Sequence, residues 1–297
     1  MNEAIEYLPC KTIVTATKNN EWFGSDYNMN IYRGCSHGCI YCDSRSEGYR
    51  DDSFFKVKVK ENALNIIERD LKGKRVKGVV GTGSMSDPYN PLEKKLELTA
   101  GALRLLARYG FGVAIATKSS LISRDLTILQ EINKTASVIV KLTITTADDE
   151  VARIIEPYIA PSSERFAALE ELSARGIYCG ILLMPVLPFI TDTVENIEAI
   201  VEKAAASKAN FIYPAFGMTL RDRQRAYYFD QLDQHFPGLS EKYKFTYGNQ
   251  YSCGSKEAKQ LMQHLVFACE KYGIQYKMKE IIGSYQKNRM TEQLQLF

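Results

Sequence analysis

Short apolar runs alternate along the chain with segments in which apolar residues recur every three or four positions. The short runs predict β-strands, and the periodic segments predict helices that pack one face against a sheet. The predicted strands span residues 29–32, 76–81, 112–117, 137–145, 177–186 and 210–218, and the predicted helices between them span residues 60–73, 92–110, 123–133, 162–176 and 192–208. Gly73, Gly110 and Gly176 lie where helix C-terminal caps are expected, and Asp192 with Glu195 has the pattern of a capping box.

This alternation predicts an α/β fold built from parallel βαβ units. Six such units form either an open doubly wound sheet or a partial barrel. From about Thr219 onward the alternation fades, and one further helix is predicted over residues 255–273. We therefore divide the chain into an N-terminal segment (1–27), an α/β core (28–218) and a mainly helical C-terminal extension (219–297).

The composition is ordinary for a globular protein of 297 residues, with 45% hydrophobic and 25% charged residues. The net charge of +3 permits a nucleic-acid partner but does not require one. The first residues do not resemble a secretory signal, and no segment approaches the roughly 20 apolar residues of a membrane span. We expect a cytoplasmic protein without a membrane partner. Its seven cysteines then point to metal or redox chemistry rather than to disulfides, although Cys179 and Cys269 lie in apolar runs and are expected to be buried.

Three of the cysteines lie close together in "RGCSHGCIYC", where Cys35, Cys39 and Cys42 have the spacing C-x3-C-x2-C. Neighbouring thiolates repel one another unless a cation holds them, which favours a metal site. A structural zinc site would need a fourth ligand; His37 could serve, but no distant pair of cysteines or histidines completes the set. A [4Fe–4S] cluster on three cysteines keeps one iron open for another ligand.

This motif, with Tyr41 before its last cysteine, resembles the signature of the radical S-adenosylmethionine (SAM) enzymes. The resemblance implies a partial (β/α)6 barrel, a [4Fe–4S] cluster on the three cysteines, and SAM bound to the open iron. It also implies reductive cleavage of SAM to a 5′-deoxyadenosyl radical that abstracts a hydrogen atom from a substrate. An electron donor such as flavodoxin or ferredoxin is implied as well.

Candidate contacts to SAM lie on or directly after the next three predicted strands. Gly81, Thr82 and Gly83 form a turn whose backbone a ligand can approach closely, although the turn could also be an ordinary βα connection. Lys118 follows the third strand and is either a solvated loop residue or a cation that faces the barrel mouth. Thr143 and Thr145 share one face of the fourth strand with Lys141, and they are candidates to contact the ribose or the carboxylate. Their occurrence can equally reflect the β propensity of threonine.

A longer set of segments resembles the spore photoproduct lyase family over about residues 28–273. These segments are "SDPYNPLEKKLELT", "ATKSSLISRDLTIL", "IEPYIAPSSERFAALEELSARGI", "MPVLPFITD" and "YGNQYSC". In that family, Lys118 matches a lysine that contacts SAM, and Thr143 matches a serine. Two positions depart from the family pattern: Met85 stands where the lyases have the hydrogen-donating cysteine, and Asp43 stands where they have a tyrosine. A thioether has no transferable S–H hydrogen, so the resemblance implies a different substrate or a different hydrogen donor.

Cys253 is the candidate for a replacement hydrogen donor. It lies in a glycine-containing loop between Tyr247 and Gly254, close to Tyr251. A relay through a thiol or a tyrosine is chemically feasible there, but an ordinary loop cysteine is the alternative.

The chain ends with "TEQLQLF", in which Gln293, Leu294, Leu296 and Phe297 resemble the peptide by which bacterial repair proteins dock on the sliding clamp. A tail that straps itself onto the barrel is the alternative. Basic stretches at residues 56–60, 72–77 and 221–228 could follow a phosphate backbone, or could be ordinary solvated surface.

The leading hypothesis is therefore a radical SAM enzyme that acts on nucleic acid, such as a DNA lesion. One alternative is radical modification of a peptide or small molecule. The other is a non-catalytic metal-binding module that docks on the clamp.

Overall fold

The computed structural model describes residues 5–47 and 53–286. Its main feature is an eight-stranded sheet with the order β11-β10-β9-β8-β7-β6-β3-β2. The six inner strands run parallel: β3 (Tyr27–Met29), β6 (Val79–Thr82), β7 (Gly112–Thr117), β8 (Val138–Thr143), β9 (Tyr178–Val186) and β10 (Phe211–Thr219). The outer strands β2 (Val14–Ala16) and β11 (Ser252–Gly254) pair antiparallel with β3 and β10. These two edges do not pair with each other within the described residues, so the predicted partial (β/α)6 barrel is confirmed.

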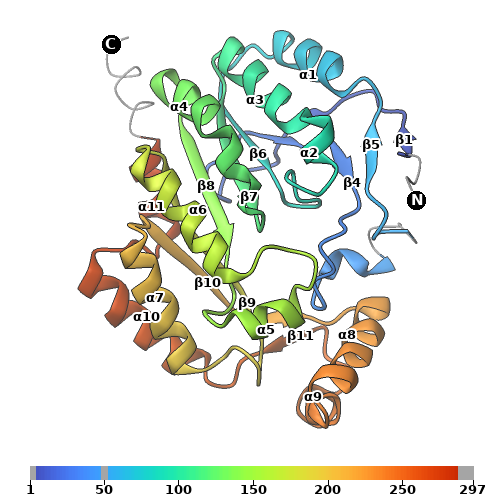
Figure 1. Ribbon diagram of the computed structural model, residues 1–297, viewed down its shortest axis with the longest axis vertical. Coiled ribbons are helices and arrows are strands. Elements are labelled where there is room, and N and C mark those ends of the chain that lie inside the picture. The colour runs from blue at the N-terminus through green and yellow to red at the C-terminus, as the bar shows by residue number, and fades with distance from the viewer. Residues whose placement is uncertain (1–4, 48–52, 287–297) are drawn as a thin grey trace.

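The helices that cover the sheet follow the strands in sequence. They are α1 (Ala63–Lys72), α3 (Leu98–Tyr109), α4 (Leu126–Thr135), α6 (Ser162–Ala174), α7 (Val194–Ala206) and α10 (Ala258–Tyr272). They lie along the outside of the strands (Figure 1). In α7, for example, Ile197, Ile200, Val201 and Ala204 are fully buried, which is the spacing that the sequence pattern predicted.

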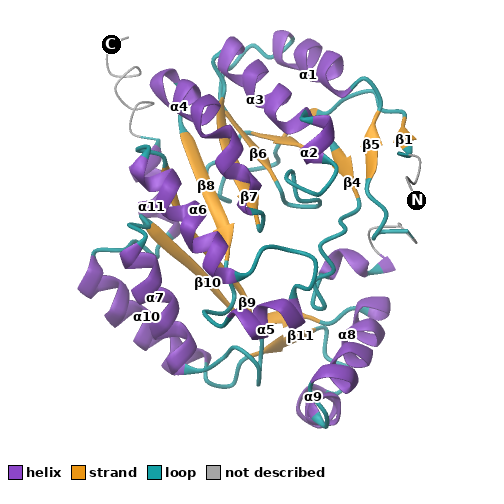
Figure 2. Ribbon diagram, in the orientation of Figure 1, coloured by secondary structure: helices purple, strands orange, loops and turns teal. Residues whose placement is uncertain are grey.

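Further elements complete the fold (Figure 2). They are α2 (Glu93–Leu96), α5 (Asp149–Ile155), α8 (Asp222–His235), α9 (Leu239–Tyr247), α11 (Met278–Tyr285) and the 3₁₀ helices η1 (Asp43–Arg45) and η3 (Ser120–Asp125). A separate three-stranded sheet contains β1 (Tyr7–Leu8), β5 (Lys58–Lys60) and β4 (Tyr32–Arg33). No helix in the described residues is long and apolar enough to cross a membrane.

The prediction of a first core strand over residues 29–32 is wrong in its position. The strand of the large sheet is β3, in which Tyr27 and Met29 are buried and Asn28 is exposed. Tyr32 belongs to β4 and pairs with Val59 in the smaller sheet. The chain therefore leaves the large sheet after Met29, and the cysteine loop starts from the smaller sheet.

The expected helix caps are confirmed in part. Gly73 and Gly110 are the C-caps of α1 and α3, and Gly176 directly follows the C-cap of α6 with φ +72°. The capping box expected from Asp192 and Glu195 is wrong. Thr193 is the N-cap of α7, and its hydroxyl accepts a hydrogen bond from the Asn196 N–H at 3.1 Å. The Asp192 carboxylate instead accepts bonds from the Phe189 N–H and the Ser255 hydroxyl.

Both ends of the described chain pack onto the core. Phe23, in the N-terminal segment, is fully buried against Phe211 and Tyr213 of β10. The Tyr285 hydroxyl of α11 donates a hydrogen bond to the carbonyl of Phe23 at 2.5 Å. These contacts fill the barrel end where the parallel strands begin, which leaves the opposite end for the site.

Candidate active site

A cavity of about 750 Å³ runs inside the curve of the sheet. Cys35, Cys39 and Cys42, in the loop after β4, line one part of it. The ends of β6, β7 and β8 contribute further polar groups. Loops that follow the carboxyl ends of parallel strands are the usual place for active sites in such folds.

The three thiols lie in a setting that disfavours free thiolates. Burial raises the pKa of all three, to about 11 for Cys35, and the Lys118 ammonium offsets part of the rise at Cys39 and Cys42. A bound cation would supply the positive charge that three thiolates need. Within the described chain, no three Cys, His, Asp or Glu side chains are arranged to hold a single metal ion. A [4Fe–4S] cluster instead takes its thiolates on separate irons, so three cysteines on one cavity wall fit it.

A buried ion pair holds the Tyr41 side chain in position. Its hydroxyl donates a hydrogen bond to Glu156, whose carboxylate lies 2.5 Å from the Arg165 guanidinium. Arg165 also donates to the carbonyl of Thr143 at the end of β8, at 3.0 Å. Because none of the three side chains is appreciably exposed, this chain of contacts joins the cysteine loop rigidly to the sheet.

The glycine turn after β6 lines the same cavity with Gly81, Thr82 and Gly83. Gly83 has φ +95°, and a Cβ there would lie 1.8 Å from the carbonyl oxygen of Ala116 on β7. Glycine at this position is therefore required for close approach of the turn to β7, whatever the turn binds.

Ser86 and Asp87 join that turn to the cysteine loop. The Ser86 hydroxyl donates a hydrogen bond to the Gly34 carbonyl at 2.5 Å. The Asp87 carboxylate accepts bonds from the Thr117 hydroxyl (2.6 Å) and the Lys118 N–H (2.8 Å), and lies 3.5 Å from the ring nitrogen of His37. His37 is thus turned toward Asp87.

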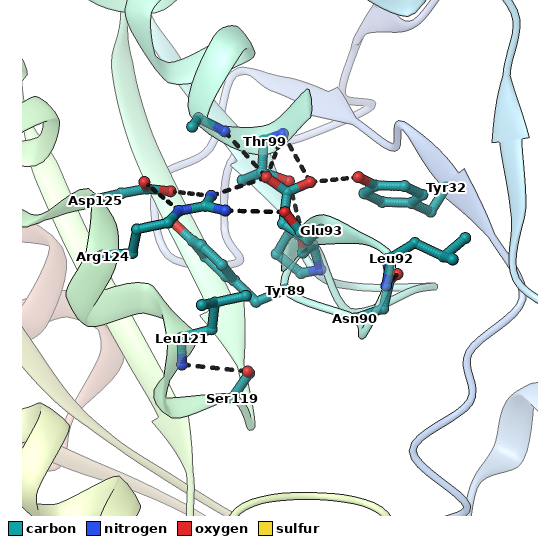
Figure 3. A network of polar contacts seen from close by, with 12 residues as sticks. Tyr32, Tyr89, Asn90, Leu92, Glu93, Thr99, Ser119, Leu121, Arg124 and Asp125 are labelled. Atoms are coloured by element: carbon teal, nitrogen blue, oxygen red, sulfur yellow. Dashed lines mark hydrogen bonds and ion pairs between the residues drawn. The ribbon is translucent and has the colours of Figure 1, made fainter. Parts of the chain in front are cut away.

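A second buried network stabilises the segment that follows Asp87 (Figure 3). Its centre is the Glu93 carboxylate, which accepts bonds from the Tyr32 hydroxyl, the Thr99 N–H and Arg124. Arg124 also pairs with Asp125 at 2.8 Å. The sequence pattern does not mark Glu93, Arg124, Glu156 and Arg165 as site residues, because they look like the exposed residues of amphipathic helices and their partners are distant in sequence.

The predicted SAM contacts do not all reach the cavity. Lys118 and Thr143 line it, with the Lys118 ammonium 5.7 Å from the centroid of the Tyr41 ring. Lys141 lines it as well. Thr145 lies beyond the end of β8, is fully buried, and is not among the lining residues. Its proposed contact stays a prediction.

Met85 and Cys253, the two residues linked to hydrogen transfer, differ in their access to the cavity. Met85 lines the cavity and is 48% exposed. Cys253, on β11, pairs with Met218 of β10 and is fully buried in a cluster with Tyr228, Tyr243 and Tyr247. Cys253 does not line the cavity, although its strand neighbour Met218 does. The clamp-like tail lies outside the described residues.

Comparison with known proteins identifies the superfamily. The family model of the radical SAM superfamily matches residues 29–204. The uncharacterized protein Rv2578c of Mycobacterium tuberculosis is 30% identical over 80% of this chain and 72% of its own length. The uncharacterized protein MJ0683 of Methanocaldococcus jannaschii is 31% identical over 80% of this chain and 86% of its own length.

Among solved structures, a spore photoproduct lyase complexed with dinucleoside spore photoproduct superposes with a TM-score of 0.65 at 14% identity, over 90% of this chain and 78% of that one. The fold is therefore of the spore photoproduct lyase type. The chain belongs to the radical SAM superfamily, whose cofactors are a [4Fe–4S] cluster and SAM.

Proposed function

We propose that this chain is an enzyme that uses SAM as a source of radicals and acts on nucleic acid. The observation that carries the proposal is that Cys35, Cys39, Cys42, the glycine turn and Lys118 line one cavity. When bound, the reduced cluster supplies the electron that cleaves SAM to a 5′-deoxyadenosyl radical, which takes a hydrogen atom from the substrate.

In this proposal, each group of residues at the site has a different role. The three cysteines hold the cluster and leave one iron without a protein ligand. Lys118 and Thr143 bind the carboxylate of SAM, and the turn at Gly81 and Gly83 receives its amino group. The Glu156–Arg165 pair keeps Tyr41, and with it the cysteine loop, in position.

The proposed substrate class is supported by the solved neighbour, a lyase bound to a dinucleoside. Near the cavity, the Arg45 guanidinium lies 3.4 Å and 3.6 Å from the ring centroids of Phe55 and Tyr227, and Phe55 is 44% exposed. Arg45 itself is buried at 8% exposure, so the exposed part of this cluster is the Phe55 ring. An exposed aromatic ring can stack on a base. Arg225, by contrast, donates to the backbone carbonyls of Leu220, Gly248 and Gln250, so it is engaged within the protein.

Met85 sets a limit on the reaction type. It lines the cavity where the lyases have their hydrogen donor, and its thioether cannot return a hydrogen atom to a product radical. The proposed reaction therefore ends differently from lyase repair, or uses another hydrogen donor. Cys253 would act there only through a relay, because it does not line the cavity.

Two protein partners are part of the proposal. A flavodoxin or ferredoxin would supply the electron, and the sliding clamp would bind the tail at Gln293, Leu294, Leu296 and Phe297. For the tail, Phe297→Ala should weaken clamp binding by about 2 kcal/mol or more in calorimetry, as expected for an apolar anchor. Equal affinity for the wild type and the variant would remove the clamp from the proposal.

The test of the substrate class is the yield of 5′-deoxyadenosine from anaerobically reconstituted, reduced protein with SAM. The reaction is run alone, with undamaged DNA, and with DNA that carries spore-type thymine lesions. A yield that rises with either DNA supports a nucleic-acid substrate, and loss of the lesion identifies repair. A yield that is the same in all three reactions would still support a radical SAM enzyme. It would reject nucleic acid as the substrate, in favour of a peptide or small molecule.

A further inference from the structure

Lys141 is an unusual residue in the central sheet. Among all described strands of the eight-stranded sheet, it is the one residue with a charged side chain. It lies in β8, where Val140 and Leu142 pack into the core beneath the helices. By the alternation of a strand, Lys141 and Thr143 point to the other face, and both line the cavity.

The Lys141 ammonium lies in an apolar environment. The residue is 2% exposed, and its Nζ lies 4.7 Å from the centroid of the buried Phe23 ring. Leu182 and Ala114, on the neighbouring strands β9 and β7, also line the cavity. Trp22, in the N-terminal segment, lines it as well and contacts the Phe23 ring edge-on. Burial lowers the pKa of Lys141 to about 7, with no charged neighbour contributing.

Lys141 has no polar partner within residues 5–47 and 53–286: no hydrogen bond or ion pair to its Nζ is found there. The other charged side chains along the cavity are Lys18, Asp43, Asp87 and Lys118. Asp87 is engaged by Thr117, by the Lys118 N–H and by His37. Strands β6, β7, β9 and β10 contribute no charge. An unpaired ammonium in such a place is costly for the folded protein, so it requires an explanation.

Lys118 and Lys141 occupy different parts of the cavity. Lys118 lies near the thiols, since its charge offsets part of the rise that burial causes in the pKa of Cys39 and Cys42. Lys141 lies two residues before Thr143 on β8, about 7 Å deeper in the barrel. The cluster and SAM belong to the Lys118 end, which leaves the inner end for another ligand.

We propose that Lys141 binds an anionic group of the substrate, a phosphate or a carboxylate, at the inner end of the cavity. The inference rests on the proposed function, because it assigns this space to the substrate. The anion supplies the partner that the ammonium lacks, and the two charges are buried as a pair. Above pH 7 the empty site is mostly neutral, so the anion enters together with a proton. For an anion whose own charge does not change in this range, such as acetate, affinity should then be constant below about pH 7 and fall about tenfold for each pH unit above it.

The test follows the pH titration of lysine side chains by NMR, in holoprotein with an oxidised cluster and ¹³C-labelled lysines. The titration is run without a probe and with each of three probes: inorganic phosphate, acetate and thymidine 5′-monophosphate. The Lys141 signal is assigned by its loss in Lys141→Met. We expect a probe to raise the titration midpoint of this signal by at least about one pH unit. A response to phosphate and the nucleotide identifies a phosphate site, and a response to acetate alone identifies a carboxylate site.

Two variants make the test specific. Lys141→Arg stays charged, so it should bind the same probe without the pH dependence above 7. Lys134→Met removes an exposed lysine of α4 and should change nothing. The inference is overturned if no probe moves the Lys141 midpoint, or if Lys141→Met binds the probes like the wild type.

Formation of 5′-deoxyadenosine by the same wild-type sample separates the two proposals. If the product forms but no probe binds at Lys141, only this inference fails. If no product forms from a complete cluster and SAM, the proposed function fails whatever Lys141 binds.

Discussion

Glu156 and Arg165 form an ion pair in which a carboxylate oxygen and a guanidinium nitrogen lie 2.5 Å apart and neither side chain is exposed. Arg165→Met would leave Glu156 as an unpaired charge behind Tyr41. Breaking a buried pair on one side typically costs about 3–5 kcal/mol, so the free energy of unfolding should fall by about that amount. Urea unfolding measures it, and iron retention should fall as the cysteine loop loosens.

A matched control for this change lies on the neighbouring helix α5. Arg153 and Asp149 lie 3.9 Å apart, with the Arg153 side chain 59% exposed. Arg153→Met should cost less than about 1 kcal/mol. If the two variants unfold at the same urea concentration, the Glu156–Arg165 pair does not support the site as we describe it.

Gly83→Ala tests the turn after β6. Its Cβ would collide with the Ala116 carbonyl, at 1.8 Å, on a backbone with φ +95°. Overpacking and the left-handed backbone together should lower the free energy of unfolding by about 3 kcal/mol or more. SAM binding, measured by equilibrium dialysis, should fall as well. Gly73→Ala is the control, since Gly73 is helical and a Cβ there has no contact closer than 3.6 Å. A variant at Gly83 as stable as the one at Gly73 would disprove the close approach.

Lys141→Met should change the pH dependence of stability. The pKa of Lys141 is about 7 in the folded protein and about 10.4 in an unfolded chain. Between these two pKa values, Lys141 is mostly protonated in the unfolded chain and mostly neutral in the folded protein. Burial of Lys141 therefore destabilises the fold most below pH 7, and this effect decreases as the pH rises toward 10.4.

The variant removes this penalty, so it should be more stable than the wild type at pH 7 and lose that advantage by about 1.4 kcal/mol per pH unit above it. Urea titrations at pH 7, 8 and 9 in an anion-poor buffer give the difference. If the difference in the free energy of unfolding between variant and wild type is the same at all three pH values, Lys141 does not titrate as described.

Met85→Cys should place an exchangeable hydrogen in the cavity. In deuterium oxide without substrate, a thiol at this position would hold deuterium and donate it to the 5′-deoxyadenosyl radical. Mass spectrometry should then find more deuterium in 5′-deoxyadenosine from the variant than from the wild type, and Met85→Ser is the control because its O–H bond is a poorer hydrogen donor. Equal deuterium in all three proteins would show that position 85 is too far from the radical.

The sequence predicted the strands and helices of the barrel well, because their apolar periodicity directly reflects burial. Gly112–Thr117 was predicted as observed, and β8 and β9 differ from prediction by one or two residues. The first strand was misplaced, because buried aromatic residues occur on both sides of the point where the chain changes sheets. The capping box at Asp192 failed because Asp192 and Thr193 are both good caps. The local contact of Asp192 with Phe189 and its tertiary contact with Ser255 decide between them.

The site was predictable where its residues are close in sequence, as in Cys35, Cys39 and Cys42. The supporting pairs were not, since Glu93 and Arg124 are 31 residues apart and only the packing of the fold brings them together. Lys141 did carry a local signal: a lysine within the apolar run "VIVKLT". A charge in the middle of a central strand has to face either a partner or a ligand.

The most direct test of the central claim is 5′-deoxyadenosine formation by the wild type and by Cys39→Ala, each reconstituted anaerobically, reduced and given SAM. Iron and sulfide are measured in the same samples. We expect a cluster and product from the wild type, and loss of both from the variant. Product from Cys39→Ala at the wild-type rate, or no product from a wild-type protein with a complete cluster, would contradict it.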